Sequence, residues 1–169
     1  MSVLLIGAGG ELGHAIARRL LSQGDEVRAI ENERDAGSRL RDIGVHVARG
    51  RELDSDLVER AAQNVRTVVA IDAPGSLMAE VIDGARAASV ERVVACGKLD
   101  RTAVDLLRDS ELDYVVLRSG PKGILRRGVE PTAIAAAVDA ADDLAGRPRL
   151  DLDLGDGVAW KRLNVNPGA

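Results

Sequence analysis

The residues best suited to chemistry lie near the amino terminus, in a glycine-rich turn. The apolar run Val3–Ile6 has the character of a buried strand, and it ends directly in Gly7-Ala8-Gly9-Gly10. From Leu12 to Ser22 apolar residues recur at helical spacing, which places Gly13 in the first turn of a helix. Glycines at such a junction let the backbone approach a phosphate, and the helix N-terminus favours negative charge. The spacing predicts a phosphate-binding turn, with a tight turn that binds no ligand as the alternative.

A carboxylate follows the second expected strand, about twenty residues beyond the glycines, where a dinucleotide-binding unit needs an acidic residue. The strand is Glu26–Ile30, and Glu31 and Asn32 come directly after it. A carboxylate at this point accepts hydrogen bonds from the 2′- and 3′-hydroxyls of a ribose and repels a 2′-phosphate, which favours NAD over NADP. Arg34 could instead serve a 2′-phosphate, and Glu31 could simply be solvated, so both alternatives stay open.

Strands alternate with helices along the rest of the chain, which is typical of a parallel sheet covered on both faces. We therefore expect an α/β fold with a doubly wound, mainly parallel, Rossmann-like sheet in three layers. A single domain over residues 1–169 is expected, with a loose tail from about residue 158. The expected strands are Ser2–Ile6, Glu26–Ile30, Val45–Ala48, Thr67–Ile71, Arg92–Ala95, Tyr114–Leu117 and a half-exposed edge strand Leu150–Leu154; the expected helices are Leu12–Ser22, Arg34–Ile43, Asp54–Gln63, Leu77–Ala88, Thr102–Asp109 and Thr132–Leu144.

Composition excludes several classes of function. The chain has 169 residues, of which 46% are hydrophobic, so it can form a proper core. A net charge of −4, the absence of Phe and a single Trp and Tyr argue against a nucleic-acid-binding surface. Cys96 is the one cysteine, which rules out an intramolecular disulfide and suits a reducing cytosol. We see no signal peptide, no membrane-spanning run and no metal-ligand spacing, and we expect a cytoplasmic protein.

The ordered set of motifs resembles the atypical short-chain dehydrogenases/reductases, and more narrowly their small NmrA-like, NAD(P)H-binding members. The resemblance runs from Val3 to about Gly157. It rests on the stretches LLIGAGGELGHAIARRL, GDEVRAIEN, GRELDSDLVERA, RDSELDYVVLRSG, PTAIAAAVDAA and LDLDLGDG. The set is specific to the superfamily, but it identifies no substrate.

The resemblance implies a set of residues that contact a dinucleotide. Gly7, Ala8, Gly9, Gly10, Glu11, Leu12 and Gly13 would form the pyrophosphate turn, Glu31 and Asn32 would lie by the adenosine ribose, Ile71, Asp72 and Ala73 would line the cofactor cleft, and Cys96 would lie near the nicotinamide. Where the family often has Gly-Asp after the third strand, this chain has Gly50-Arg51. Arg51 could stack on adenine, or the pocket could be weakened.

The sequence departs from the family where the reductive chemistry normally resides. A Tyr-x-x-x-Lys pair usually supplies the acid, but Tyr114 lies in an expected strand and Arg118 follows it four residues on. We interpret Tyr114 as a packing residue and Cys96 as an inert, buried thiol, with a reactive thiol as the alternative. Lys98 and Arg101 could reach the cofactor, although a solvated role is favoured for each. The catalytic residues stay unassigned.

Two functions fit this pattern, and a third stays open. One is a small NAD(P)-dependent oxidoreductase or epimerase that lacks the Tyr-x-x-x-Lys pair and acts on a small-molecule substrate, with NAD slightly favoured over NADP. The other is a non-catalytic dinucleotide-sensing or scaffold module, and the third is a fold that has lost the nucleotide. We also expect exposed apolar faces on the late helices and a homodimer through the Ala-rich helix Thr132–Leu144.

Overall fold

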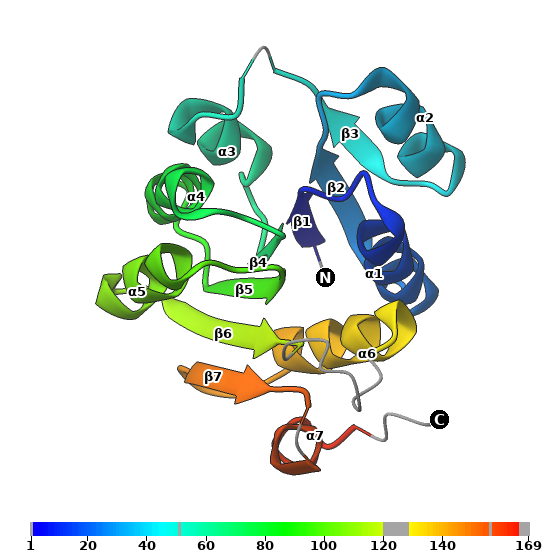
Figure 1. Ribbon diagram of the computed structural model, residues 1–169. Helices are drawn as coiled ribbons and strands as arrows, with labels where there is room; N and C mark the ends of the chain where they lie inside the picture. Colours follow the sequence, from blue (N-terminus) through cyan, green and yellow to red (C-terminus); the bar gives the residue numbers. More distant parts are fainter. Residues whose placement is uncertain (1, 51, 120–128, 156, 166–169) are drawn as a thin grey trace.

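Seven parallel strands form one sheet in the computed structural model, which describes residues 2–50, 52–119, 129–155 and 157–165 (Figure 1). The strands are β1 (Ser2–Ile6), β2 (Glu26–Ile30), β3 (His46–Ala48), β4 (Thr67–Ile71), β5 (Arg92–Gly97), β6 (Asp113–Arg118) and β7 (Arg149–Asp153). The helices are α1 (Glu11–Ser22), α2 (Arg34–Asp42), α3 (Ser55–Ala61), α4 (Gly75–Ala87), α5 (Arg101–Asp109), α6 (Pro131–Asp142) and α7 (Gly157–Leu163).

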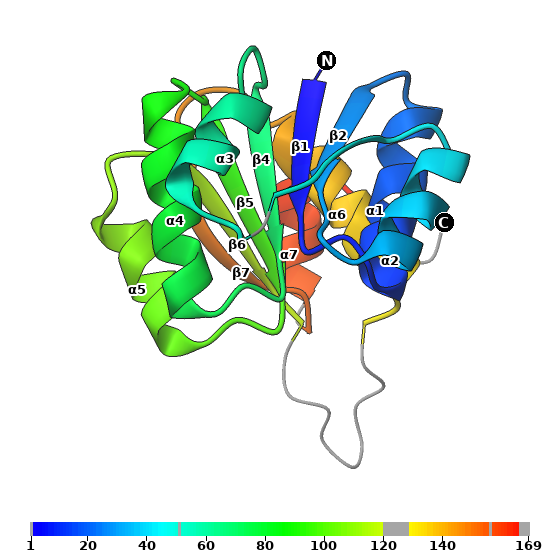
Figure 2. The ribbon, with the colours of Figure 1, turned by 90° about the horizontal axis from the view of Figure 1, so that it is seen from above.

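The strand order is β3-β2-β1-β4-β5-β6-β7, and every neighbouring pair is parallel. Seen from above, α3, α4 and α5 cover one face of the sheet, and α1, α2 and α6 cover the other (Figure 2). This arrangement confirms the expected doubly wound, Rossmann-like, three-layered fold. The edge position predicted for the strand at Leu150 is also confirmed, since β7 pairs only with β6 among the described strands.

Two hydrophobic cores explain why the strands are apolar at consecutive positions. Successive side chains of a strand point to opposite faces. In β1, Val3 and Leu5 therefore pack with α1 and α6, whereas Leu4 and Ile6 pack with α3 and α4. With almost no aromatic residues, both cores consist mainly of Val, Leu, Ile and Ala side chains.

Two expectations about the end of the chain are wrong within the described residues. The tail is not loose from about residue 158, because α7 buries Ala159, Trp160 and Leu163, and the Trp160 indole N–H donates to the Leu154 carbonyl over 3.0 Å. The late helices do not expose apolar faces, because Ile134 and the other large apolar side chains of α5 and α6 are covered by the sheet and their neighbours. Val158 is the one exposed large hydrophobic residue in the described part.

Candidate functional site

The predicted site residues gather at one end of the sheet. The carboxyl ends of β2, β1, β4 and β5 are neighbours, so the segments that follow these four strands meet at the same edge. The chain reverses its direction of winding beside β1, because β2 and β3 lie on one side and β4 on the other. Ligands of open α/β sheets bind outside the carboxyl ends of the strands at such a reversal.

Each glycine of the first turn has a separate structural reason. Gly7 has φ +80°, and a Cβ there would collide with the Ile71 carbonyl at the end of β4. Gly13 lies against the backbone of Ala8, so α1 can approach the turn only without a side chain at this position. Gly10 is different, because a Cβ there would meet no atom within 4 Å. Gly7 and Gly13 thus shape the turn, while Gly10 leaves open space in front of it.

The N-terminus of α1 is uncapped by any side chain. Gly10 is the N-cap residue, with φ −90° and ψ −179°, and it provides no side-chain hydrogen bond. Among the described residues, no N-cap side chain accepts from the first N–H groups of α1, and the space around a Cβ at Gly10 is open. Uncapped N–H groups together with the helix dipole form a site for an anion.

Glu31 bends back over this turn from the end of β2. Its Oε1 accepts a hydrogen bond from the backbone N–H of Glu33 over 3.0 Å, and a Cβ on Gly9 would lie 2.6 Å from its Oε2. Gly9 thus makes room for the carboxylate. Asn32 links the ends of two strands instead, because its Oδ1 accepts from the Gly50 N–H over 3.2 Å.

The segments after β4 and β5 are joined through Asp72. Asp72 has φ +51°, and its Oδ1 accepts a hydrogen bond of 2.5 Å from the Lys98 N–H. Its own N–H donates to the Cys96 carbonyl over 3.0 Å. A Cβ on Gly97 would collide with the Asp72 carboxylate, so Gly97 is required for this contact. Ile71 and Ala73, on either side of Asp72, are buried and offer only backbone to the edge.

Asp100 is a residue of this edge that the sequence analysis did not single out. It caps α5 by accepting from the Ala103 N–H over 2.7 Å, and it also accepts from the Gly75 N–H, the first of α4, over 3.0 Å. One carboxylate thus holds two neighbouring helix N-termini together. Hydrogen bonds from Ala103 and then Gly75 lower the pKa of Asp100 below its usual value. Its place before a helix signals the first cap, but no sequence signal points to Gly75.

We expect Asp100→Ala to lower the melting temperature by roughly 2–4 °C, because both helix N-termini lose their acceptor. The folded-state pKa of Asp100 lies below the unfolded value, so its stabilisation is fully present above about pH 4 and is lost as the pH falls below the folded pKa. Thermal unfolding of both proteins at about pH 7 and about pH 3 should show the gap closing in acid. An equal gap at both values would contradict this assignment.

Three further residues have the roles that the sequence favoured for them. Cys96 is fully buried, and burial, with Asp72 as a second cause, raises its thiol pKa, which favours the inert interpretation. Tyr114 lies at the amino end of β6, away from the site, and packs in the core with the Arg149 guanidinium over its ring at 5.2 Å. Arg101 is almost fully exposed and pairs with Asp105.

The other residues predicted at the pyrophosphate turn and beside the adenine are Glu11, Leu12 and Arg51. Arg51, predicted beside the adenine, lies outside the described residues. Glu11 is exposed at the start of α1, and Leu12, the next residue, packs partly against the core. In the described part of the chain, no group of three His, Cys, Asp or Glu side chains could hold a metal ion. None of the helices seen there has both the length and the apolar character to span a bilayer.

Comparison with known structures supports the fold. The chain is similar to anaerobillin reductase ChuY from Escherichia coli O157:H7, with 22% identity, a TM-score of 0.70 and coverage of 89% of this chain and 95% of that chain. It is similar to an NADPH-dependent quinone oxidoreductase from Escherichia coli complexed with NADPH, with 20% identity, a TM-score of 0.76 and coverage of 90% and 68%.

A third similar structure is the Citrobacter sp. triphenylmethane reductase complexed with NADP(H), with 19% identity, a TM-score of 0.70 and coverage of 90% and 69%. No curated protein matches the sequence. The family model described as NAD(P)H-binding matches residues 7–102, which span the glycine turn, Glu31 and the ends of β4 and β5. This match covers more than half of the chain, and the chain therefore belongs to the NAD(P)H-binding family.

Proposed function

We propose that this protein is a small NAD(P)H-dependent oxidoreductase or epimerase of the atypical short-chain dehydrogenase/reductase type. The observation that carries the dinucleotide site is the uncapped N-terminus of α1 behind Gly10, where a Cβ would meet no atom. The N–H groups there would bind the pyrophosphate, and Gly7 and Gly13 let strand, turn and helix pack closely enough to present them.

We propose that NADH is preferred to NADPH because of Glu31. Its carboxylate lies beside the turn, where it would accept hydrogen bonds from the ribose hydroxyls and repel a 2′-phosphate. Two observations favour NADPH instead. Arg39 lies within 3.4 Å of the Gly9 carbonyl and would attract a phosphate, and two of the similar structures contain NADP(H). A binding experiment decides between the two.

A bound nicotinamide supplies or accepts a hydride, so this chain's task is to bind and orient it. The described residues place no Tyr–Lys acid pair at the carboxyl edge, since Tyr114 is at the other end of β6 and Cys96 is buried. We therefore propose an electron-poor acceptor that takes a hydride without a proton from such a pair. Quinones and triphenylmethane dyes have this chemistry, and reductases for both kinds of molecule share the fold.

The second candidate is a dinucleotide sensor or scaffold that binds without turnover. The same missing pair favours it, because binding needs the glycine turn and Glu31 but no acid. The expected homodimer and the cytoplasmic location stay predictions. The apolar face of α6 is buried within the chain, where it packs beside α1. A dimer would therefore need another surface.

Isothermal titration with NAD, NADH, NADP and NADPH tests the proposal. We expect NADH to bind at micromolar levels and more tightly than NADPH. Turnover is tested by following the loss of NADH absorbance with a benzoquinone or a triphenylmethane dye as acceptor. Binding without loss of NADH with either acceptor would favour the sensor, and no binding of any dinucleotide would overturn both candidates.

Replacing Glu31 by alanine tests the preference. We expect NADH to bind about tenfold more weakly, because hydrogen bonds to a charged acceptor are lost, while NADPH binding is unchanged or improved. Asp35→Asn, an exposed carboxylate of α2, is the control and should change neither affinity. If Glu31→Ala weakens both dinucleotides equally, Glu31 supports the fold of the turn and does not read the ribose.

A further inference from the structure

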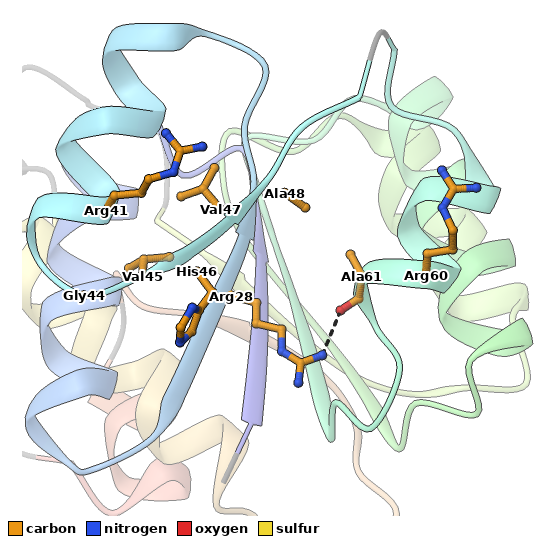
Figure 3. A pocket seen from close by; sticks show the side chains of 9 residues that line it. All are labelled: Arg28, Arg41, Gly44, Val45, His46, Val47, Ala48, Arg60 and Ala61. Carbon is orange, nitrogen blue, oxygen red and sulfur yellow. Dashed lines mark hydrogen bonds between the residues drawn. The ribbon is translucent and has the colours of Figure 1, made fainter.

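A cavity lies along the outer edge of the sheet, beside the strand β3. Its volume is about 590 Å³, and strand β3 forms its floor through His46, Val47 and Ala48 (Figure 3). Because β3 is the edge strand and pairs only with β2 among the described strands, this cavity runs along an open edge of the sheet. We call it the β3 groove.

The backbone of β3 has groups free to pair with a further strand. The Ala48 carbonyl points inward, since it accepts from the Glu31 N–H over 3.2 Å. The direction of the backbone polar groups alternates along a strand, so the N–H and carbonyl of Val47 point to the open edge. A strand that pairs with them would extend the sheet in the manner of peptide-binding domains that use strand addition.

Arginine side chains flank the β3 groove from two helices. Arg41 on α2 and Arg60 on α3 line it from opposite sides of β3, and no hydrogen bond or ion pair holds either of them within the described part of the chain (Figure 3). Arg28 is held in place, because it donates to Glu26 Oε1 and to the Gln63 carbonyl, each over 2.8 Å. The described residues contribute no acidic side chain to the lining.

The positions of these charges select one kind of occupant. The side chains of Arg41 and Arg60 do not point toward one another, so a single small oxyanion would not contact both (Figure 3). A second copy paired at β3 about a two-fold axis would bring the same arginines of both copies together, which is unfavourable. In an added strand, by contrast, consecutive side chains point to opposite faces, one toward Arg41 and the next toward Arg60.

We propose that the β3 groove is a docking site for an extended acidic segment of another protein, which adds to β3 as a strand and pairs adjacent carboxylates with Arg41 and Arg60. The proposal does not rest on the proposed dinucleotide function, because it uses the edge of β3 that faces away from β2. Strand addition supplies affinity through the backbone, and the arginines supply the preference for acidic side chains.

A test uses the full-length protein labelled with ¹⁵N and the acetylated peptide amide Thr-Val-Glu-Glu-Val-Thr. We expect saturable shifts of the His46, Val47 and Ala48 amide signals. The same peptide with Gln-Gln in place of Glu-Glu should bind about tenfold more weakly, and so should the acidic peptide to the double variant Arg41→Gln, Arg60→Gln. Arg18→Gln, on the exposed side of α1, is the control and should bind like the unmodified protein.

A charge reversal makes the test sharper. The double variant Arg41→Glu, Arg60→Glu should prefer a Lys-Lys peptide to the acidic one, which a merely structural role of the arginines would not produce. The proposal is overturned if the β3 amides do not shift, or if the Glu-Glu and Gln-Gln peptides bind equally well. It is also overturned if pyrophosphate alone saturates the same amides, which would indicate a small-anion site, or if the shifts depend on protein concentration without peptide, which would indicate a second copy.

Discussion

Replacing Gly10 by tryptophan is expected to weaken dinucleotide binding at least about 100-fold while leaving the fold intact. The reason is geometric. Gly10 is the N-cap residue of the uncapped helix α1 and has open space around its Cβ position, so an indole there would fill the position that we propose for the pyrophosphate. Because no atom lies within 4 Å of a Cβ at Gly10 and its φ is −90°, the backbone accepts a side chain at this position without strain or a collision at the Cβ.

Calorimetry with NADH and thermal unfolding, run on the same preparations, separate the two effects. Arg18→Trp on the exposed side of α1 is the matched control, because it adds the same indole to the same helix away from the turn. We expect the control to bind normally and both variants to melt within a few degrees of the unmodified protein. Normal NADH binding by Gly10→Trp would show that the glycine turn is not the dinucleotide site, even though the chain belongs to the NAD(P)H-binding family.

Most of the fold could be predicted from the sequence because a strand buried on both faces must be apolar at consecutive positions. Thr67–Ile71 was predicted with the observed bounds for this reason, and it forms β4 with all five residues buried. The predicted bounds fail where a side chain from another segment holds the start of a helix. Helix α4 begins at Gly75, earlier than Leu77, because the Asp100 carboxylate accepts from the Gly75 N–H.

The candidate site was predictable only where one segment carries the whole signal. The glycine turn is local, so the spacing of Gly7 and Gly13 indicates it without the rest of the chain. The contacts of Asp72 with Lys98 and of Asp100 with Gly75 each join residues about 25 positions apart through backbone groups, which no side-chain pattern reports. The expectation that the late helices expose apolar faces is wrong for the same reason. The sequence of an Ala-rich helix such as α6 does not reveal which part of the fold covers it.

Arg92 is expected to be the largest single polar contributor to stability. It lies at the start of β5 and is only 6% exposed, beneath the end of α6. Its guanidinium donates to the carbonyls of Ala141, Asp142 and Leu144, each over 2.7 Å. Helix C-termini leave carbonyls without intrahelical partners, and a cation is favourable there because of the helix dipole. Burial, and then the neighbouring Arg66, lower the pKa of Arg92.

Replacing Arg92 by methionine should therefore lower the free energy of unfolding by about 3 kcal/mol, or the melting temperature by roughly 6–12 °C. Apolar replacement of a buried ion pair is sometimes neutral, but that outcome requires both partners to be removed. Here the Ala141 and Leu144 carbonyls lose their donor, and the Asp142 carbonyl keeps only the hydrogen bond from Arg66. Arg66→Met should cost less, because Arg66 is a quarter exposed and because Arg92, which donates to the Asp142 carbonyl, still supplies a positive charge close to the buried Asp142 carboxylate. The free energy of unfolding of Arg92→Lys should fall between those of Arg92→Met and the unmodified protein, since an ammonium retains the charge but cannot reproduce the fork that spans three carbonyls.

Urea unfolding of the three variants measures these differences. An Arg92→Met protein as stable as the original would mean that the end of α6 is held by its own hydrogen bonds and not by Arg92.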